Sequence, residues 1–200
     1  MKTAVIYLAA GKSSRMGHNK LEKPWKNTTL GSSALQQVLK SSAEEVIIVT
    51  NQSVWIDNRI FEQNKRAIRL TASPQAVKGQ AYSLRTGVNE AVRIGAEAVL
   101  VVLADQPGLT AETIDRLIVQ ARRQTCDFAG MWTGHHYQPP MLFKKQMFAA
   151  LQKVEGDRGA ASILRTEHAW TGIPYTDFQQ VEQLDIDTKE EYRWMLHRQQ

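Results

Sequence analysis

A short apolar run that leads directly into a glycine-containing loop is the feature that most constrains this chain. Residues 4–8 read Ala-Val-Ile-Tyr-Leu, and the loop after them, residues 9–20, contains Gly11 and Gly17. An uninterrupted apolar run predicts a strand buried on both faces, as in a parallel sheet, rather than an edge strand. Because open α/β sheets bind ligands beyond the carboxyl ends of their strands, this loop is a candidate binding loop.

The charges of the loop indicate an anionic ligand. Lys12, Arg15 and Lys20 supply positive charge, and the glycines let backbone N–H groups approach a phosphate closely. The spacing matches neither of two common phosphate loops: five residues separate the two glycines, where the Walker loop has four, and the dinucleotide fingerprint would need a further glycine between them. The alternative interpretation is a solvated basic turn.

The length predicts one domain, residues 1–200, or at most two small ones. The chain is 42% hydrophobic, which is enough for a sizeable core. Apolar runs alternate with amphipathic stretches, a rhythm that predicts βαβ units and a mainly parallel sheet. The expected strands are 4–9, 45–50, 98–104, 126–132, 139–143 and 169–174, and the expected helices are 30–41, 80–95, 144–153, 158–166, 188–198 and one that begins near Thr110.

Composition also narrows the classes of function. The net charge is +5, but the basic residues are scattered, so a nucleic-acid partner is not indicated. The single cysteine, Cys126, excludes an intrachain disulfide and is expected to be a buried thiol in a reducing compartment. The first apolar run is too short for a signal peptide or a membrane span. We therefore expect a cytoplasmic protein with no membrane partner.

Two acidic motifs could hold a divalent cation. The apolar run 98–104 ends at Asp105, which places a carboxylate at the carboxyl end of a strand. Mg²⁺ binds oxygen and often uses one or two protein carboxylates together with substrate phosphates. Near the C-terminus, Asp185 and Asp187 would share one face of an extended segment. Either could join Asp105, while the other caps the helix that begins near Thr188; Asp105 itself could be only a turn cap.

Two glycine turns lead into predicted helices and are further candidates. Gly79, Gln80 and Ser83 lie at the start of the helix expected over 80–95, where an N-terminus can meet an anion or the edge of a base. A second turn, residues 156–160, reads Gly-Asp-Arg-Gly-Ala. A purely structural helix start is the alternative in both places.

Taken in order, these motifs resemble the MocA-like branch of the MobA-like NTP transferase family, the molybdenum cofactor cytidylyltransferases. The resemblance rests on 8–17 with Lys20, on 79–83, on Leu-Ala-Asp-Gln-Pro at 103–107, on 156–160 and on Asp-Ile-Asp-Thr at 185–188. It spans nearly the whole chain. Accessory proteins for xanthine dehydrogenase maturation look similar.

The resemblance implies a fold and a set of site residues. The fold would be a Rossmann-like three-layer α/β/α sandwich, similar to nucleotide-diphospho-sugar transferases, with a nucleotide-binding half at about 1–108 and an acceptor-binding half at about 109–200. Arg15, Lys20 and Asp105 would be catalytic, and Asp105 with Asp187 would bind Mg²⁺, with Asp185 in reserve. The nucleotide-binding residues would be Leu8, Ala9, Ala10, Gly11, Lys12, Ser13, Ser14, Arg15, Lys20, Gly79, Gln80 and Ser83.

The implied reaction is transfer of CMP from CTP to a molybdopterin-type cofactor, with release of pyrophosphate. Ala9-Ala10-Gly11 resembles the members that use CTP more than those that use GTP. The implied role is maturation of a molybdenum hydroxylase such as xanthine dehydrogenase, in purine catabolism. Residues 137–140 depart from the family pattern where the pterin should lie. Two alternatives therefore stay open: transfer to a sugar or alcohol phosphate, and a non-catalytic carrier that inserts the molybdenum cofactor.

Overall fold

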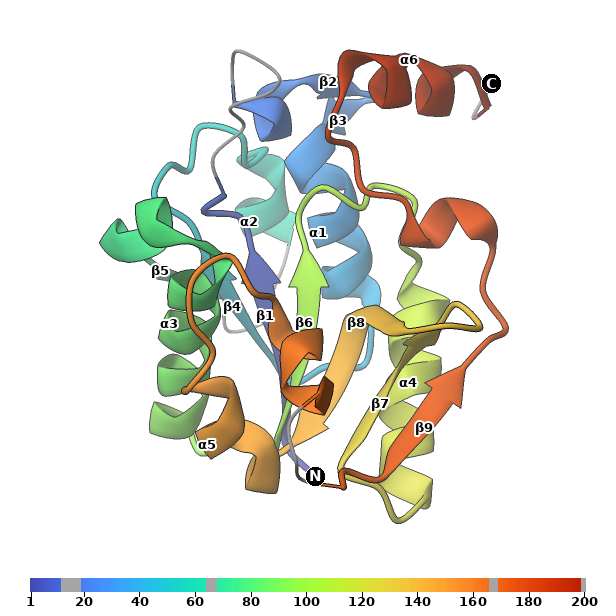
Figure 1. Cartoon of the computed structure of the whole chain (residues 1–200). Helices are drawn as coiled ribbons and strands as arrows, with labels where there is room; N and C mark the ends of the chain where they lie inside the picture. The colour runs from blue at the N-terminus through green and yellow to red at the C-terminus, as the bar shows by residue number, and fades with distance from the viewer. Residues whose placement is uncertain (12–18, 64–67, 166–168, 199–200) are drawn as a thin grey trace.

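The computed structural model describes residues 1–11, 19–63, 68–165 and 169–198. Within these ranges one seven-stranded sheet forms the centre of the molecule, with the strand order β5-β4-β1-β6-β8-β7-β9 (Figure 1). The strands are β1 (Thr3–Leu8), β4 (Glu45–Val49), β5 (Ile68–Thr71), β6 (Ala98–Leu103), β7 (Phe128–Trp132), β8 (Tyr137–Lys144) and β9 (Gly172–Tyr175). Strands β5, β4, β1 and β6 are parallel to one another, and β8 runs antiparallel to both β6 and β7.

Helices cover both faces of this sheet. The α-helices are α1 (Leu30–Lys40), α2 (Arg59–Gln63), α3 (Gln80–Arg93), α4 (Ala111–Arg123), α5 (Phe148–Leu151) and α6 (Lys189–Arg198). The buried side chains of α1 and α4 belong to one core cluster, and those of α3 and α5 belong to the other. The expected three-layer α/β/α sandwich is therefore confirmed.

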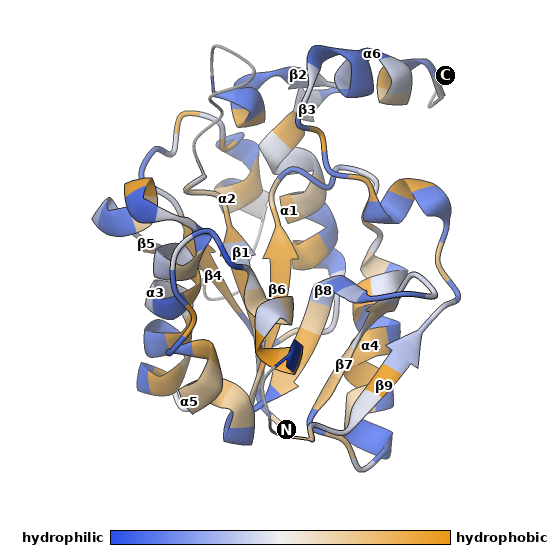
Figure 2. Ribbon diagram, in the orientation of Figure 1, coloured by the Kyte–Doolittle hydropathy of each residue, from blue (hydrophilic) through white to orange (hydrophobic). Residues whose placement is uncertain are grey.

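Strand β1 shows why the sheet forms at the centre. All six of its residues are buried, with Val5 and Tyr7 in the core beneath α1 and α4, and Ala4 and Ile6 in the core beneath α3. Alternate side chains of a strand point to opposite faces, so an apolar run without interruption fills both cores. Figure 2 shows the central strands as predominantly hydrophobic, while the helices carry hydrophilic residues as well.

Several elements differ from the sequence expectations. The β2–β3 hairpin (Pro24–Trp25 with Thr28–Thr29), helix α2 and strand β5 were not expected. Two-residue strands are too short for any periodicity, and β5 is half exposed rather than continuously buried. The helices expected at 144–153 and 158–166 consist largely of the 3₁₀ turns η4 (Lys145–Met147) and η5 (Ala160–Arg165), with only α5 between them.

The single cysteine lies in the core, as expected from composition. Cys126 is buried and free, and burial raises the pKa of its thiol, so the prediction of a core cysteine is confirmed. No helix among the described residues is both long enough and apolar enough to span a membrane.

Replacing Gly87 in α3 with valine should destabilise the fold. A Cβ atom at position 87 would lie 2.4 Å from Cγ2 of Ile6, which is fully buried in β1. Overpacking a core contact of this kind costs about 1–3 kcal/mol. We expect Gly87→Val to lower the free energy of unfolding, measured by urea titration, by about 2 kcal/mol.

Val92→Ala is the matched control, because Val92 lies on the same helix but is half exposed. Its effect should stay within about 0.5 kcal/mol. An equal loss in both variants would show that the contact between α3 and β1 does not set the effect.

Candidate active site

The register of two neighbouring strands brings the candidate residues to one edge of the sheet. β1 and β6 are parallel, and Leu8 at the end of β1 lies opposite Leu103 at the end of β6. The backbone N–H of Ala104 then donates to the carbonyl of Leu8 over 3.1 Å. The chain therefore leaves both strands at the same level, with the loop after β1 on one side and Asp105 on the other.

Lys20 is the centre of the candidate site. It begins the 3₁₀ turn η2 (Lys20–Glu22), and the Asn19 side chain caps this turn by accepting from the N–H of Leu21. The ammonium Nζ of Lys20 lies 2.6 Å from Oδ2 of Asp105 and 2.7 Å from Oδ1 of Asp187. Burial alone lowers the pKa of Lys20, but the two carboxylates outweigh it, so the pKa is raised and the side chain stays charged.

The Asp187 carboxylate makes this contact, while two other residues cap α6. The Thr188 hydroxyl accepts from the N–H of Glu191, and the Glu191 carboxylate accepts from the N–H groups of Asp187 and Thr188. This reciprocal arrangement satisfies the first turn of the helix. A backbone hydrogen bond from Ile186 to the carbonyl of Asp105, 3.0 Å long, brings the C-terminal segment against the end of β6.

Asp185 is the third acid of the site and has a different environment. It reaches solvent, but protein atoms around its carboxyl group displace water, and together with the neighbouring Asp105 carboxylate they raise its pKa to about 7. Gln106 hydrogen-bonds to this carboxyl group and donates from Nε2 to the carbonyl of Pro139 over 3.3 Å. Sequence reasoning included Gln106 in the motif at 103–107 but assigned no role to this buried amide, which links the end of β6 to β8.

A cavity of about 370 Å³ adjoins the Lys20 contact. Its floor is the ends of β1 and β6, and its far wall is the start of α3. Ten of the residues that line it are Leu8, Ala9, Ala10, Gly11, Lys20, Gly79, Gln80, Ser83, Asp105 and Asp157. A volume of this size is in the range of small-molecule pockets. All the residues that were expected to bind the nucleotide, and that the structure describes, therefore line this one cavity.

Two glycine turns meet at the wall of the cavity. Gly79 has a φ of 134°, and a Cβ atom there would lie 2.2 Å from the carbonyl oxygen of Gly156. That carbonyl accepts a hydrogen bond from the N–H of Ala81, which satisfies one of the backbone donors at the start of α3. Asp157, the next residue, lines the cavity; the sequence interpretation left open whether its turn meets a ligand or only starts a helix. This contact between distant segments could not be predicted from either segment alone.

Some expectations fall outside the described residues or need correction. Lys12, Ser13, Ser14 and Arg15 lie in a part of the chain that the structure does not describe, so their expected roles stay predictions. Asp185 and Asp187 were expected in an extended strand, but no strand includes them.

Comparison with known proteins shows the family. The model for the MobA-like NTP transferase domain matches residues 5–171. The chain belongs to the MobA-like NTP transferase family. Purine catabolism protein PucB of Bacillus subtilis (strain 168) is 32% identical over 194 residues, which cover 94% of this chain and 92% of PucB. Nicotine blue oxidoreductase of Paenarthrobacter nicotinovorans is 28% identical over 171 residues, 80% of each chain.

Solved structures support the same fold. The crystal structure of Rv0371c from Mycobacterium tuberculosis H37Rv superposes with a TM-score of 0.80 at 21% sequence identity, covering 98% of this chain and 99% of that one. A structure of Rv0371c in complex with manganese gives a TM-score of 0.74 at 18% identity, with the same coverage. At these identities the likeness concerns the fold alone.

Asp185→Asn should flatten the dependence of stability on pH. The pKa of Asp185 is raised from 3.8 to about 7 in the folded state, so between these values the folded protein holds a proton that the unfolded chain has released. Stability from this group is therefore present at low pH and is lost as the pH rises towards 7. Free energies of unfolding at pH 4.5, 6 and 8 should show this loss in the original protein and not in Asp185→Asn.

The control is Asp157→Asn, which removes a carboxylate from the cavity wall but leaves the Asp185 group intact. It should retain the pH dependence of the original chain. The same slope in all three proteins would show that Asp185 titrates as an ordinary surface acid.

Proposed function

We propose that this chain is a Mg²⁺-dependent nucleotidyltransferase that transfers CMP from CTP to a molybdopterin-type molybdenum cofactor. Its role would be maturation of a molybdenum hydroxylase such as xanthine dehydrogenase. The observation that carries the proposal is the contact of Lys20 with Asp105 and Asp187 beside a cavity at the carboxyl ends of β1 and β6.

The reaction needs alignment and charge stabilisation rather than a protein nucleophile. An oxygen of the terminal phosphate of the acceptor would attack the α-phosphorus of CTP, and the bond from that phosphorus to the bridging oxygen of the β-phosphate would break. Pyrophosphate leaves with the electron pair. Lys20 lies where its ammonium could donate to phosphate oxygens, and Gly79, Gln80 and Ser83 would contact the nucleoside.

The donor set fits a hard divalent cation. Asp105 and Asp187 present carboxylate oxygens to one point, and Oδ1 of Asp105 is buried without a hydrogen-bond partner among the described residues. Within those residues no three His, Cys, Asp or Glu side chains gather as a metal cluster. Mg²⁺ commonly binds through two carboxylates with water and substrate phosphates, and it would neutralise charge on the phosphates. Rv0371c, which has the same fold, forms a complex with manganese.

The choice of substrates rests on the relatives and on the loop after β1. PucB, named for purine catabolism, covers nearly the whole chain, which supports a role near xanthine dehydrogenase. Ala9 and Ala10 line the cavity before Gly11, the pattern that resembles members using CTP. Residues 137–140, which depart from the family pattern, belong to β8 and contact Gln106 through Pro139.

Pyrophosphate release tests the proposed reaction. We expect release from CTP with Mg²⁺ only when the molybdenum-loaded pterin is present, and much less release with GTP. Pyrophosphate release with a sugar or alcohol phosphate in place of the pterin would show that this phosphate, rather than the pterin, is the acceptor. Binding of the pterin without release from either nucleotide would contradict catalysis and favour the carrier interpretation.

Asp105→Asn should lower kcat about 100-fold, because it removes charge at the proposed metal site while leaving the size of the side chain unchanged. Lys20→Met should have an effect of similar size, because the charge stabilisation that it removes is worth about 3 kcal/mol in a dry site. Pyrophosphate release at saturating Mg²⁺ is the measurement.

Surface substitutions of the same kind serve as controls. Asp177→Asn removes an exposed acid that pairs with Arg116, and Lys153→Met removes an exposed lysine beyond α5. Neither residue lines the nucleotide cavity. Both should retain the original kcat, and full activity in Asp105→Asn would remove that residue from the site.

A further inference from the structure

A second, larger hollow crosses the outer side of α1. Its volume is about 690 Å³, and it shares no lining residue with the nucleotide cavity. Four segments and Val181 enclose it: the β2–β3 hairpin at 25–28, α1 from 33 to 40, the start of α2 at 59–60, and the loop 107–110. We call this hollow the α1 groove. The reaction proposed above uses none of it.

The α1 groove is positively charged. Lys26, Lys40 and Arg59 line it, and no aspartate or glutamate does. Lys26 and Lys40 are exposed, and neither side chain hydrogen-bonds or pairs with an acid in the part of the chain that the structure describes. Unpaired cations on a concave surface attract anions, and a groove of one charge sign concentrates that attraction.

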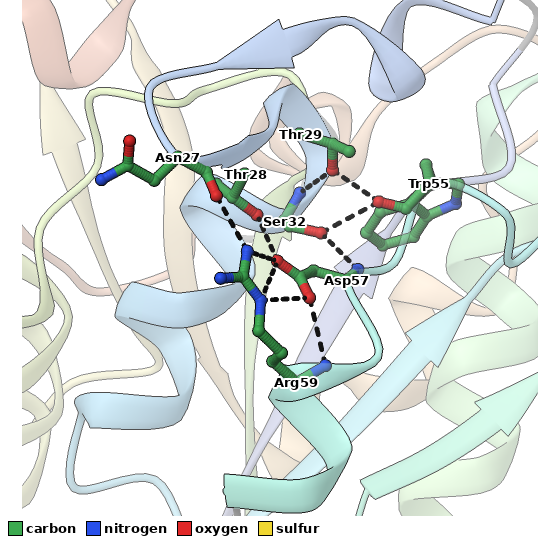
Figure 3. A network of polar contacts seen from close by, with 7 residues as sticks. All are labelled: Asn27, Thr28, Thr29, Ser32, Trp55, Asp57 and Arg59. Atoms are coloured by element: carbon green, nitrogen blue, oxygen red, sulfur yellow. Dashed lines mark hydrogen bonds and ion pairs between the residues drawn. The ribbon is translucent and has the colours of Figure 1, made fainter.

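A fixed network holds one wall of the groove (Figure 3). The Arg59 guanidinium donates to both carboxylate oxygens of Asp57 and to the carbonyl of Asn27. Thr29 and Ser32 both donate to the carbonyl of Trp55. These bonds tie the hairpin to the start of α2. A preformed wall lowers the ordering cost of binding.

One nitrogen of Arg59 is left for a ligand. Nε and Nη2 make all the hydrogen bonds of the guanidinium to described residues, and in Figure 3 the third nitrogen has no dashed line. The Asn27 amide also extends away from the network in that view. The groove therefore offers donors in addition to its charges.

The length of the groove selects among anions. The groove follows α1 from Ser33 to Lys40, a rise of roughly 10 Å at 1.5 Å per residue, and Lys26 lines it from the hairpin that precedes this helix. A single phosphate is too small to span this length. An extended peptide rises about 3.3 Å per residue, so about three residues would span the length along α1 and further residues would reach Lys26. Amides of Asn27, Gln36 and Gln37 along the way suit a peptide backbone.

We propose that the α1 groove binds an acidic, extended segment of a partner protein. A single-stranded nucleic acid is the less suitable anion, because the aromatic ring among the lining residues, Trp25, is 1% exposed and offers no platform for stacking a base. Binding depends on charge, so it weakens as salt screens the lysines.

A fluorescein-labelled peptide of six glutamates is the probe, followed by fluorescence anisotropy with the full chain. We expect binding at low salt that a six-glutamine peptide does not show, and at least a fivefold loss of affinity in Lys40→Glu. Lys26→Asn should also weaken binding. It removes the charge but suits the backbone there, because Lys26 has a φ of 48° and asparagine tolerates that region.

Lys153→Glu is the charge-matched control and should bind the peptide at nearly the original affinity, because that exposed lysine lies beyond α5 on the opposite side of the sheet. Carbodiimide, which joins a carboxylate to a lysine amine, should attach the peptide to Lys26 or Lys40, as read by mass spectrometry. Equal losses in Lys40→Glu and Lys153→Glu, attachment elsewhere, or no binding at all would overturn the proposal. Tighter binding of a labelled six-nucleotide thymidine strand than of the peptide would also overturn it.

Discussion

The parallel pairing of β1 with β6 is the constraint on which the rest of the structure depends. Because Leu8 lies opposite Leu103, the loop after β1 and the acid after β6 leave the sheet at the same level. A shift of one residue along either strand would move its end by about 3.3 Å and turn its side chains to the other face. The contact between Lys20 and Asp105, 2.6 Å long, would not survive such a shift. The apolar side chains of β1, buried on both faces, thus fix the geometry of the polar site above them.

The carboxylates at this site need positive charge beside them. One ammonium group, Lys20, faces Asp105 and Asp187, and Asp185 stands beside them with its pKa raised. Carboxylates held this close repel one another, and the lysine offsets part of that repulsion. A triphosphate would compete for the same ammonium, since its oxygens are also anionic. A second cation would then be needed to keep the carboxylates ionised, which is the role proposed above for Mg²⁺.

The sequence predicted the inner part of the fold better than its edges. β1, β4 and β6 are continuous apolar runs, and α1, α3 and α4 follow them with clear amphipathic patterns, so their positions could be predicted within a few residues. Asp105 could be chosen as a candidate because it follows such a run, and Asp185 and Asp187 because they alternate with apolar residues. The Lys20–Asp187 contact and the Gly79–Gly156 approach could not, because each joins segments that only the folded chain brings together. Asp185 illustrates the same limit, since its pKa depends on neighbours that spacing does not reveal.

The segment from Lys20 to Thr29 shows how one short stretch can serve two surfaces. Leu21 and Trp25 are buried, the N–H of Leu30 bonds to the carbonyl of Lys23, and the Tyr192 hydroxyl donates to the carbonyl of Pro24. These contacts hold the segment between the core and α6. A lysine on a long, flexible side chain loses rotamer entropy when it is fixed, and a rigid backbone beneath Lys20 limits the further entropy that its site must overcome. The same anchoring presents Lys26 to the α1 groove, so the backbone that positions the candidate catalytic cation also sets one end of this positively charged groove.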